Sequence, residues 1–264
     1  MEDHPSLEDA LAAMERRAEN AAHSTSRLLA ALKRAQQSAR SGDLAALKKA
    51  VAEQMDLLRA ADADAKDLSR AWPYSDDEER RVLEDGRFLR EVVETATRQG
   101  VTITEQDGLL LSYPVIVRLD PTRRAVTINR KLDRRIRPTF LVKQLAALQQ
   151  RPIKFKPAQF IESLYSAWEY ARRRVGVDQL FASDVKVNDL WTVFTVAPGS
   201  AAEYPRQEFG RDLYLLEGSE VRETRTGAHI HFSRSTGTKQ PGAIVVVGED
   251  GRRVTYSSIS FTLS

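Results

Sequence analysis

The chain has 264 residues, of which 42% are hydrophobic and 29% are charged. This length and composition exclude wholesale disorder and are typical of a globular protein with two or three folding units. The absence of cysteine excludes disulfides, thiolate nucleophiles and cysteine-rich zinc sites. No apolar run approaches the ~20 residues that cross a bilayer, and the acidic first residues do not resemble a signal peptide, so we expect a cytoplasmic protein without membrane contact.

Charge is distributed unevenly along the chain. Residues 1–100 contain 16 Lys and Arg against 20 Asp and Glu, whereas residues 101–264 contain 24 against 17. The net charge is therefore −4 for the first segment and +7 for the second. We expect the two segments to face different partners.

Two consecutive helices are predicted from heptad patterns, in which apolar or small residues are spaced alternately by three and four. The members of the first pattern are Leu7, Leu11, Met14, Ala18, Ala21, Thr25, Leu28, Leu32, Ala35 and Ala39. The members of the second are Leu44, Leu47, Val51, Gln54, Leu58, Ala61, Ala65, Leu68 and Trp72. The short turn Ser41-Gly42-Asp43 between them predicts an antiparallel hairpin.

The hairpin carries a predicted partner-binding surface. Leu29, Met55 and Leu57 lie outside both patterns and are expected to widen its apolar face. This face can hold a partner from a larger protein complex, or a second copy of the chain in a homodimer. An antiparallel hairpin can also satisfy its patterns internally, so the oligomeric state stays open.

A third helix and a β-ribbon are predicted next. Ser75 and Glu78 have the spacing of a capping box, which starts a helix that ends near Gly100. From residue 101 the period changes to two, which predicts strands over 101–104, 109–119 and 125–129. A helix over 139–149 follows, with four residues directed inward: Phe140, Leu141, Leu145 and Leu148.

The C-terminal segment is predicted to contain three helices and then a β-hairpin. The helices cover about 157–174, 187–196 and 205–217, and the strands cover 221–225 and 228–233. In this order of elements, residues 157–234 resemble the winged helix-turn-helix superfamily, which implies a module that reads DNA or docks on a protein. A last hairpin, of strands 243–248 and 252–263, is expected to extend the sheet.

Together these elements predict an α+β protein in three domains. An antiparallel helical hairpin, or coiled coil, covers residues 1–100. A basic β-ribbon with one helix covers residues 101–150. A winged-helix-like module with an extra C-terminal β-hairpin covers residues 151–264.

A dense group of nine cations is the strongest functional signal in the sequence. Its members are Arg118, Arg123, Arg124, Arg130, Lys131, Arg134, Arg135, Arg137 and Lys143. Cations on a β-ribbon and at a helix start can reach successive phosphates, so we predict contact with nucleic acid, with DNA as a candidate. Pairing with the acidic N-terminal half of a neighbouring subunit and a plain solvated surface stay as alternatives. On the predicted wing, Arg222 and Arg225 are further expected nucleic-acid contacts.

No metal site is predicted. His229 and His231 share one face of a strand and could meet one metal ion, but no third ligand has a suitable spacing. No cofactor is expected either, because phosphate-loop motifs are absent. The segment 235–239, which is glycine-bearing and basic, is expected to be an ordinary loop.

No catalytic residue is predicted. Asp120 and Lys131 are one of two residue pairs that resemble a nuclease site weakly. Asp120 precedes Pro121 in a predicted turn, and this turn accounts for its carboxylate without a catalytic role. We therefore expect a non-enzymatic accessory or scaffold subunit of a DNA-associated bacterial assembly, for genome maintenance or phage defence. A dimeric winged-helix transcriptional regulator is the first alternative, and a metal-dependent nuclease is the second.

Overall fold

The computed structural model describes residues 5–106, 108–151, 154–174, 184–234 and 242–263. The predicted α+β class is confirmed, with an N-terminal helical hairpin and an antiparallel C-terminal sheet. The chain forms two compact units, Met1–Glu91 with Arg137–Thr139, and Val92–Ile136 with Phe140–Ser264. The three-domain division made from the sequence stays a prediction. In the described ranges, no helix is long and apolar enough to cross a membrane.

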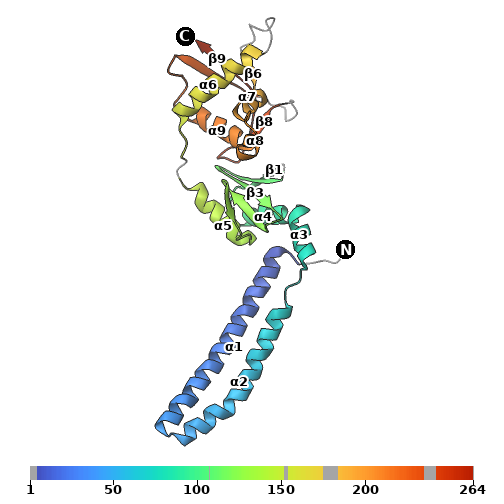
Figure 1. The fold of residues 1–264 in the computed structure, drawn as a ribbon, viewed down its shortest axis with the longest axis vertical. Coiled ribbons are helices and arrows are strands. Elements are labelled where there is room, and N and C mark those ends of the chain that lie inside the picture. Colours follow the sequence, from blue (N-terminus) through green and yellow to red (C-terminus); the bar gives the residue numbers. More distant parts are fainter. Residues whose placement is uncertain (1–4, 107, 152–153, 175–183, 235–241, 264) are drawn as a thin grey trace. The chain divides into compact units, whose positions relative to one another are not determined.

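The first unit is built on two helices that run side by side, α1 (Leu7–Ser41) and α2 (Leu44–Arg70) (Figure 1). Ser6 caps α1 by accepting a hydrogen bond from the Asp9 N–H at 3.1 Å. Gly42 in the turn has a φ of 75°, the left-handed conformation that favours glycine. The predicted hairpin and its turn are confirmed.

The two helices touch through a heptad row that keeps every second predicted position and shifts the others by one residue. The buried or half-buried residues of this contact row are Met14, Arg17, Ala21, Ser24, Leu28, Ala31, Ala35 and Ser38 on α1, and Leu47, Ala50, Gln54, Leu57, Ala61, Asp64 and Leu68 on α2. Positions 18, 25, 32, 51, 58 and 65, which the sequence placed in the contact, are exposed. Small residues such as Ser24, Ala31 and Ala50 let the two backbones approach closely, whereas large side chains at these positions would hold them apart.

Two carboxylates fix the root of the hairpin. The Glu91 carboxylate accepts hydrogen bonds from the N–H groups of Leu7 at 3.1 Å and Glu8 at 2.7 Å, which have no partner within the helix. The Glu8 carboxylate accepts from the Thr139 N–H at 2.9 Å and from the Arg137 guanidinium at 2.7 Å. Burial raises the pKa of Glu8, but these hydrogen bonds outweigh burial, and the pKa lies below its usual value.

Two short helices, α3 (Asp76–Glu84) and α4 (Arg87–Arg98), replace the single third helix that was predicted. The predicted capping box of Ser75 and Glu78 is confirmed at the start of α3. The break lies at Gly86, which has a φ of 78°, and the Asp85 carboxylate accepts a hydrogen bond from the Arg87 N–H at 3.0 Å. The left-handed Gly86 ends one helix, and the carboxylate of the preceding Asp85 caps the next.

The second unit begins with a five-stranded antiparallel meander. Its strands are β1 (Thr104–Gln106), β2 (Leu109–Ser112), β3 (Val115–Asp120), β4 (Ala125–Ile128) and β5 (Lys131–Asp133). The predicted strand over 109–119 is wrong, because a cis Tyr113–Pro114 bond turns the chain between β2 and β3. The short edge strand β5 was not predicted.

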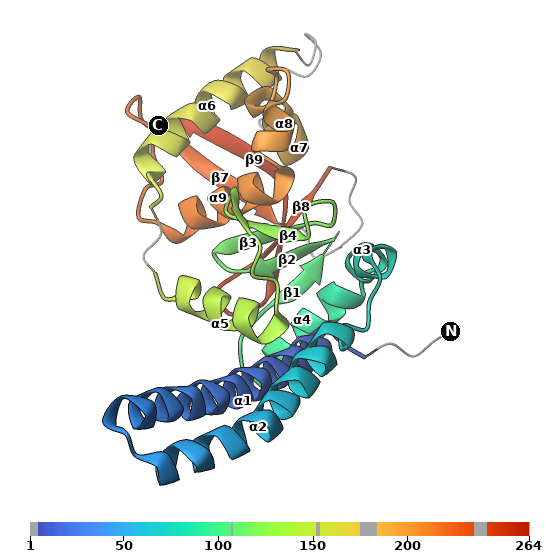
Figure 2. The same ribbon diagram turned by 60° about the horizontal axis from the view of Figure 1, so that its bottom comes forward.

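Helix α5 (Pro138–Gln149) lies beside this sheet (Figure 2). Its Gln149 amide donates to the Ser112 hydroxyl and to the Thr102 carbonyl, each at 2.9 Å. Leu141 and Leu145 are fully buried, as predicted. The inward placement of Phe140 is wrong, because this ring is 42% exposed.

The rest of the second unit combines four helices with a second sheet. The helices are α6 (Pro157–Arg174), α7 (Val187–Phe194), α8 (Ser200–Glu203) and α9 (Arg206–Gly218). The strands are β6 (Val185–Lys186), β7 (Ala228–Arg234), β8 (Ile244–Val247) and β9 (Arg253–Leu263). Among the described strands, β6, β7 and β8 each pair with β9, which confirms the predicted last hairpin.

The first arm of the predicted wing is not a strand. Residues 221–225 make one isolated bridge, between Glu223 and His229. The cause lies at the end of α9, where the Arg222 guanidinium donates to the carbonyls of Leu216 at 3.0 Å and Ser219 at 2.7 Å. Residues 221–225 are therefore held at the C-terminal end of α9 and do not form a continuous strand beside β7.

The core of this part lies between α6, α9 and the second sheet. Phe209, Leu213 and Leu216 of α9 are fully buried. Helix α9 contacts β8 at Gly210, where an added Cβ would lie 2.6 Å from the Ile244 Cγ2. The absence of a side chain at this glycine permits the close approach of helix and strand.

Candidate functional site

Three exposed cations occupy the region where β5 meets α5. Lys131 is on the edge strand β5, Arg134 follows that strand, and Lys143 is on the exposed side of α5. Within the described part of the chain, none of the three takes part in an ion pair. We call Lys131, Arg134 and Lys143 the basic corner.

Asp133 ties the two elements of the basic corner together. Its carboxylate is 12% exposed and accepts hydrogen bonds from the Arg135 guanidinium at 2.6 Å and from the Gln144 amide at 2.9 Å. The Arg135 hydrogen bond is the largest cause that holds the pKa of Asp133 far below its usual value. Arg135 also lies over the exposed Phe140 ring, 5.1 Å from its centroid. Sequence reasoning missed Phe140, which adds an aromatic face to the corner.

A separate groove of about 490 Å³ lies between the five-stranded sheet and α8–α9. Its lining residues are Ile116, Arg118, Arg123, Thr127, Arg130, Leu132, Ala202, Glu203, Pro205 and Glu208. In the strand register Arg118 pairs with Thr127 and Thr127 with Leu132, so these three share one face of the sheet. Lys131 pairs with Ile128 and belongs to the opposite face. The structure therefore divides the predicted group of cations between two surfaces.

Glu208 of α9 neutralises one of the cations of the groove, Arg130. The Arg130 guanidinium donates to this carboxylate at 2.5 Å and 3.1 Å, and the Glu208 side chain is only 9% exposed. The hydrogen bond raises the pKa of Arg130. Arg123 has a weaker ion pair with Asp120 at 3.7 Å. In the described residues Arg118 has no ion pair, so it is the cation of the groove with most freedom to meet an anion.

The remaining two members of the predicted group lie elsewhere. Arg124 is exposed in the turn between β3 and β4, with a φ of 48°. Arg137 belongs to the hairpin unit, where its guanidinium binds Glu8 at 2.7 Å and Glu15 at 2.6 Å. Its ion pairs give Arg137 a structural role in the root of the hairpin.

The two cations of the predicted wing differ from each other. The Arg222 guanidinium donates to backbone carbonyls of residues 216–221, including that of Glu217. Arg225 is exposed, and its N–H donates to the Glu162 carboxylate at 2.7 Å. Only the Arg225 side chain is therefore placed to meet a ligand.

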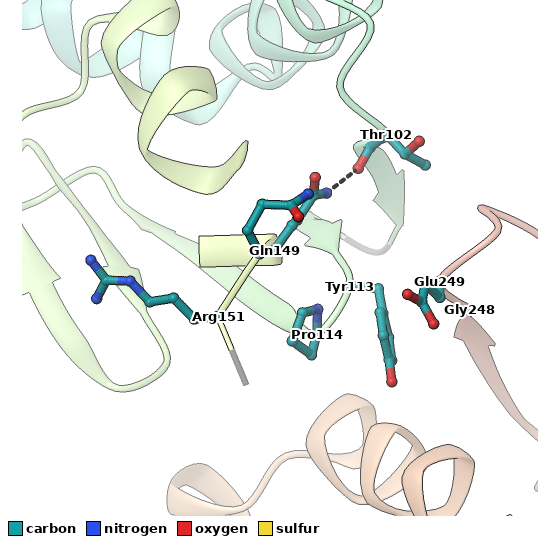
Figure 3. Close-up of a pocket in the computed structure, with 8 residues that line it drawn as sticks. Thr102, Tyr113, Pro114, Gln149, Arg151, Gly248 and Glu249 are labelled. Carbon is teal, nitrogen blue, oxygen red and sulfur yellow. Dashed lines mark hydrogen bonds between the residues drawn. The ribbon is translucent and has the colours of Figure 1, made fainter. Parts of the chain in front are cut away.

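A polar pocket of about 430 Å³ lies in the second unit between β2, α5 and the turn after β8 (Figure 3). Tyr113 forms one wall and packs edge-on against Tyr214, with 5.3 Å between ring centroids. Burial raises the pKa of Tyr113 to about 12. Glu249 lies near Tyr113, whereas the Arg151 side chain points away from both (Figure 3). The charged groups do not converge on one point, so the pocket selects no ligand class.

The histidine pair has no third ligand in the described ranges. The rings of His229 and His231 lie 5.1 Å apart, and Glu223 approaches the His229 Nδ1 at 3.5 Å. No group of three metal-ligating side chains occurs among the described residues. The segment 235–239 lies outside the described residues.

The register also separates the nearest nuclease pair. Asp120 pairs with Ala125 and shares its sheet face with Arg118, whereas Lys131 pairs with Ile128 and belongs to the opposite face. Asp120 accepts a hydrogen bond from the Arg123 N–H at 3.1 Å, as a turn carboxylate does. The two side chains therefore do not meet at one metal position.

On the hairpin, two of the three predicted partner-binding residues are exposed. Leu29 and Met55 expose 51% and 52% of their surfaces. Leu57 is half-buried in the contact row, so its predicted placement outside the helix contact is wrong. The reason is the shift of every second contact position by one residue, which places Leu57 in the contact and Leu58 on the surface.

Comparisons with known proteins add no relative: no family model, no curated protein and no solved structure matches the chain.

Proposed function

We propose that the protein is a non-enzymatic accessory or scaffold subunit that joins nucleic acid, through its basic second unit, to a protein partner held by the hairpin. The observation that carries the proposal is the basic corner, where three exposed cations have no ion pair within the described residues and α5 adds the exposed Phe140 ring. Such cations meet phosphates, and an exposed ring can stack on a base. A cytoplasmic bacterial assembly for genome maintenance or phage defence would suit this role.

The geometry favours this proposal over its two alternatives. A winged-helix regulator would use Arg222 and Arg225 on a wing, but the Arg222 guanidinium is bound to backbone carbonyls at the end of α9, which leaves Arg225 as the single exposed one of the two. A nuclease at Asp120 would need a second group on the same sheet face, and Lys131 is on the other one. The basic corner needs neither a wing nor a metal.

The test is a titration of the full chain against a fluorescent single strand and a duplex at two salt concentrations. We expect binding at low salt that weakens steeply as salt rises, because each neutralised phosphate contributes a slope of roughly 0.7 to 0.9 in log–log units. The variant Lys131→Gln/Arg134→Gln/Lys143→Gln should bind roughly tenfold more weakly or worse, with a slope smaller by about 2 to 3.

The matched control removes three exposed cations from the hairpin, in the variant Arg16→Gln/Arg59→Gln/Arg70→Gln. It changes the net charge equally and should keep the wild-type slope. Equal losses in both variants would mean that only net charge attracts the strand, and the basic corner would then not be the site. Absence of wild-type binding at low salt would overturn the nucleic-acid half of the proposal.

A further inference from the structure

One side of the hairpin carries an apolar stripe. Six large apolar side chains, each between 41% and 67% exposed, form it: Leu29, Leu32, Leu44, Val51, Met55 and Leu58. Scattered single exposed leucines are normal on a protein surface, but a contiguous group of this size marks an interaction site. The stripe therefore marks a candidate interaction surface.

Helical geometry places the stripe on one side. Leu29 and Leu32 each follow a contact-row residue by one position, and so do Val51, Met55 and Leu58. One residue is a rotation of about 100° in the same sense along each chain. Because α1 and α2 are antiparallel, equal rotations away from their mutual contact bring both sets to the same side of the hairpin.

The two sets are also level along the hairpin. The Arg34 guanidinium contacts the Glu53 carboxylate at 3.4 Å, which puts these two residues at the same height. Counting from that pair in opposite directions puts Leu32 beside Met55 and Leu29 beside Leu58. The stripe is therefore continuous across the two helices.

The stripe lies in the basic half of the hairpin. Residues 24–60, the distal half, contain seven Lys and Arg against three Asp and Glu, a net charge of +4. The proximal half, residues 7–23 and 61–70, contains four against seven, a net charge of −3. Lys48 lies in the same row as the stripe, and Lys33 follows Leu32; both are exposed.

A second copy of the chain fits this surface poorly. Pairing stripe with stripe brings together two distal halves of charge +4 each. Shifting the copies to match opposite charges sets the stripe against the proximal half, where the exposed residues of the same row are small or polar: Glu15, Ala18, Ala22, Asp62, Ala65 and Ser69. Apolar burial and charge complementarity therefore cannot be achieved together in a homodimer.

We propose that the distal half of the hairpin binds an amphipathic helix of a partner protein, with an apolar face flanked by Asp and Glu. Such a helix buries its i, i+3, i+4 and i+7 side chains on the apolar stripe and places its carboxylates near Lys33 and Lys48. The inference rests on the partner-binding part of the proposed function. It is independent of the basic corner, which is on the other unit.

The experiment uses the full chain and a synthetic fluorescent helix of about 20 residues, with Leu on one face and Glu beside it, in fluorescence anisotropy. The control peptide replaces every Glu with Lys. We expect the Glu peptide to bind at least tenfold more tightly at low salt. Leu29→Ser/Met55→Ser should abolish binding, and Lys33→Glu/Lys48→Glu should reverse the preference between the peptides. Ala18→Ser/Ala65→Ser, in the same row of the proximal half, should change nothing.

Three results would overturn the proposal. Equal binding of both peptides would show that the charges beside the stripe do not select an acidic helix. Failure of both peptides, with a dimer in light scattering that Leu29→Ser/Met55→Ser dissociates, would assign the stripe to a second copy. Failure of both, with binding to anionic lipid vesicles that the same variant abolishes, would assign it to a membrane surface. The strand titration of the same protein reports separately on the basic corner, so the two proposals can fail independently.

Discussion

Gly210→Ala should destabilise the second unit by about 1–3 kcal/mol, the usual cost of overfilling a well-packed core. An added Cβ would lie 2.6 Å from the Ile244 Cγ2 and 2.8 Å from the Val246 Cγ2. Ile244 and Val246 cannot move aside easily, because both side chains are buried and their strand, β8, is paired with β9. Helix α9 would have to move away from the sheet, which opens the core around the fully buried Phe209 and Leu213.

The same helix supplies a matched control for this prediction. An added Cβ at Gly218, in the last turn of α9, has no atom within 4 Å. Gly218→Ala should therefore be neutral or stabilise by up to ~1 kcal/mol, since alanine is the better helix former. Urea unfolding followed by tryptophan fluorescence would compare the two. Equal midpoints for both variants would show that α9 and β8 are not in close contact.

Glu8→Gln should weaken the root of the hairpin by about 2–3 kcal/mol, because a charge-assisted hydrogen bond and an ion pair are lost together. The Glu8 side chain is 15% exposed and binds Arg137 and Thr139. Hydrogen exchange of residues 7–20 and 137–139 would report the loosening. Glu15→Gln, at the 55% exposed partner of the same Arg137, is the milder comparison and should cost well under 1 kcal/mol.

The effect of Glu8→Gln should depend on pH in a defined direction. The pKa of Glu8 in the folded chain lies below its usual value of 4.5, so its stabilisation is fully present above that value. It is lost as the pH falls through the folded pKa. The difference in unfolding free energy between wild type and variant should be constant near neutrality and shrink below about pH 4.5. A difference that grew in acid would contradict the lowered pKa.

The hairpin was predictable from the sequence, but only every second position of its contact row was. Gly42 and the cap at Asp43 specify the turn locally, and both are in place. The row is ambiguous because Ser24, Ala31 and Ala50 are small, so an adjacent row with Leu32 and Val51 has the stronger apolar signal. The structure places these small residues in the contact, where they permit close packing of the two backbones.

The strands and the candidate site depend on contacts that are distant in sequence. The cis bond before Pro114 divides one predicted strand into β2 and β3, and the residue types alone do not reveal its isomer. The dense group of cations was visible in the sequence. Its division between two surfaces was not, because the ion pair between Arg130 and Glu208 joins residues 78 positions apart. The register of the strands places Lys131 and Arg118 on opposite faces of the sheet.

The central strand of the second sheet has a consequence for how the protein is made. Among the described strands, β6, β7 and β8 pair with β9 alone, and β9 follows all three in the chain. During synthesis the sheet cannot form until residues 253–263 have left the ribosome. Until then, the buried side chains of α6, α7 and α9 have no sheet to pack against. This part of the second unit therefore cannot complete its core before β9 has emerged, and its apolar side chains stay exposed to solvent until then.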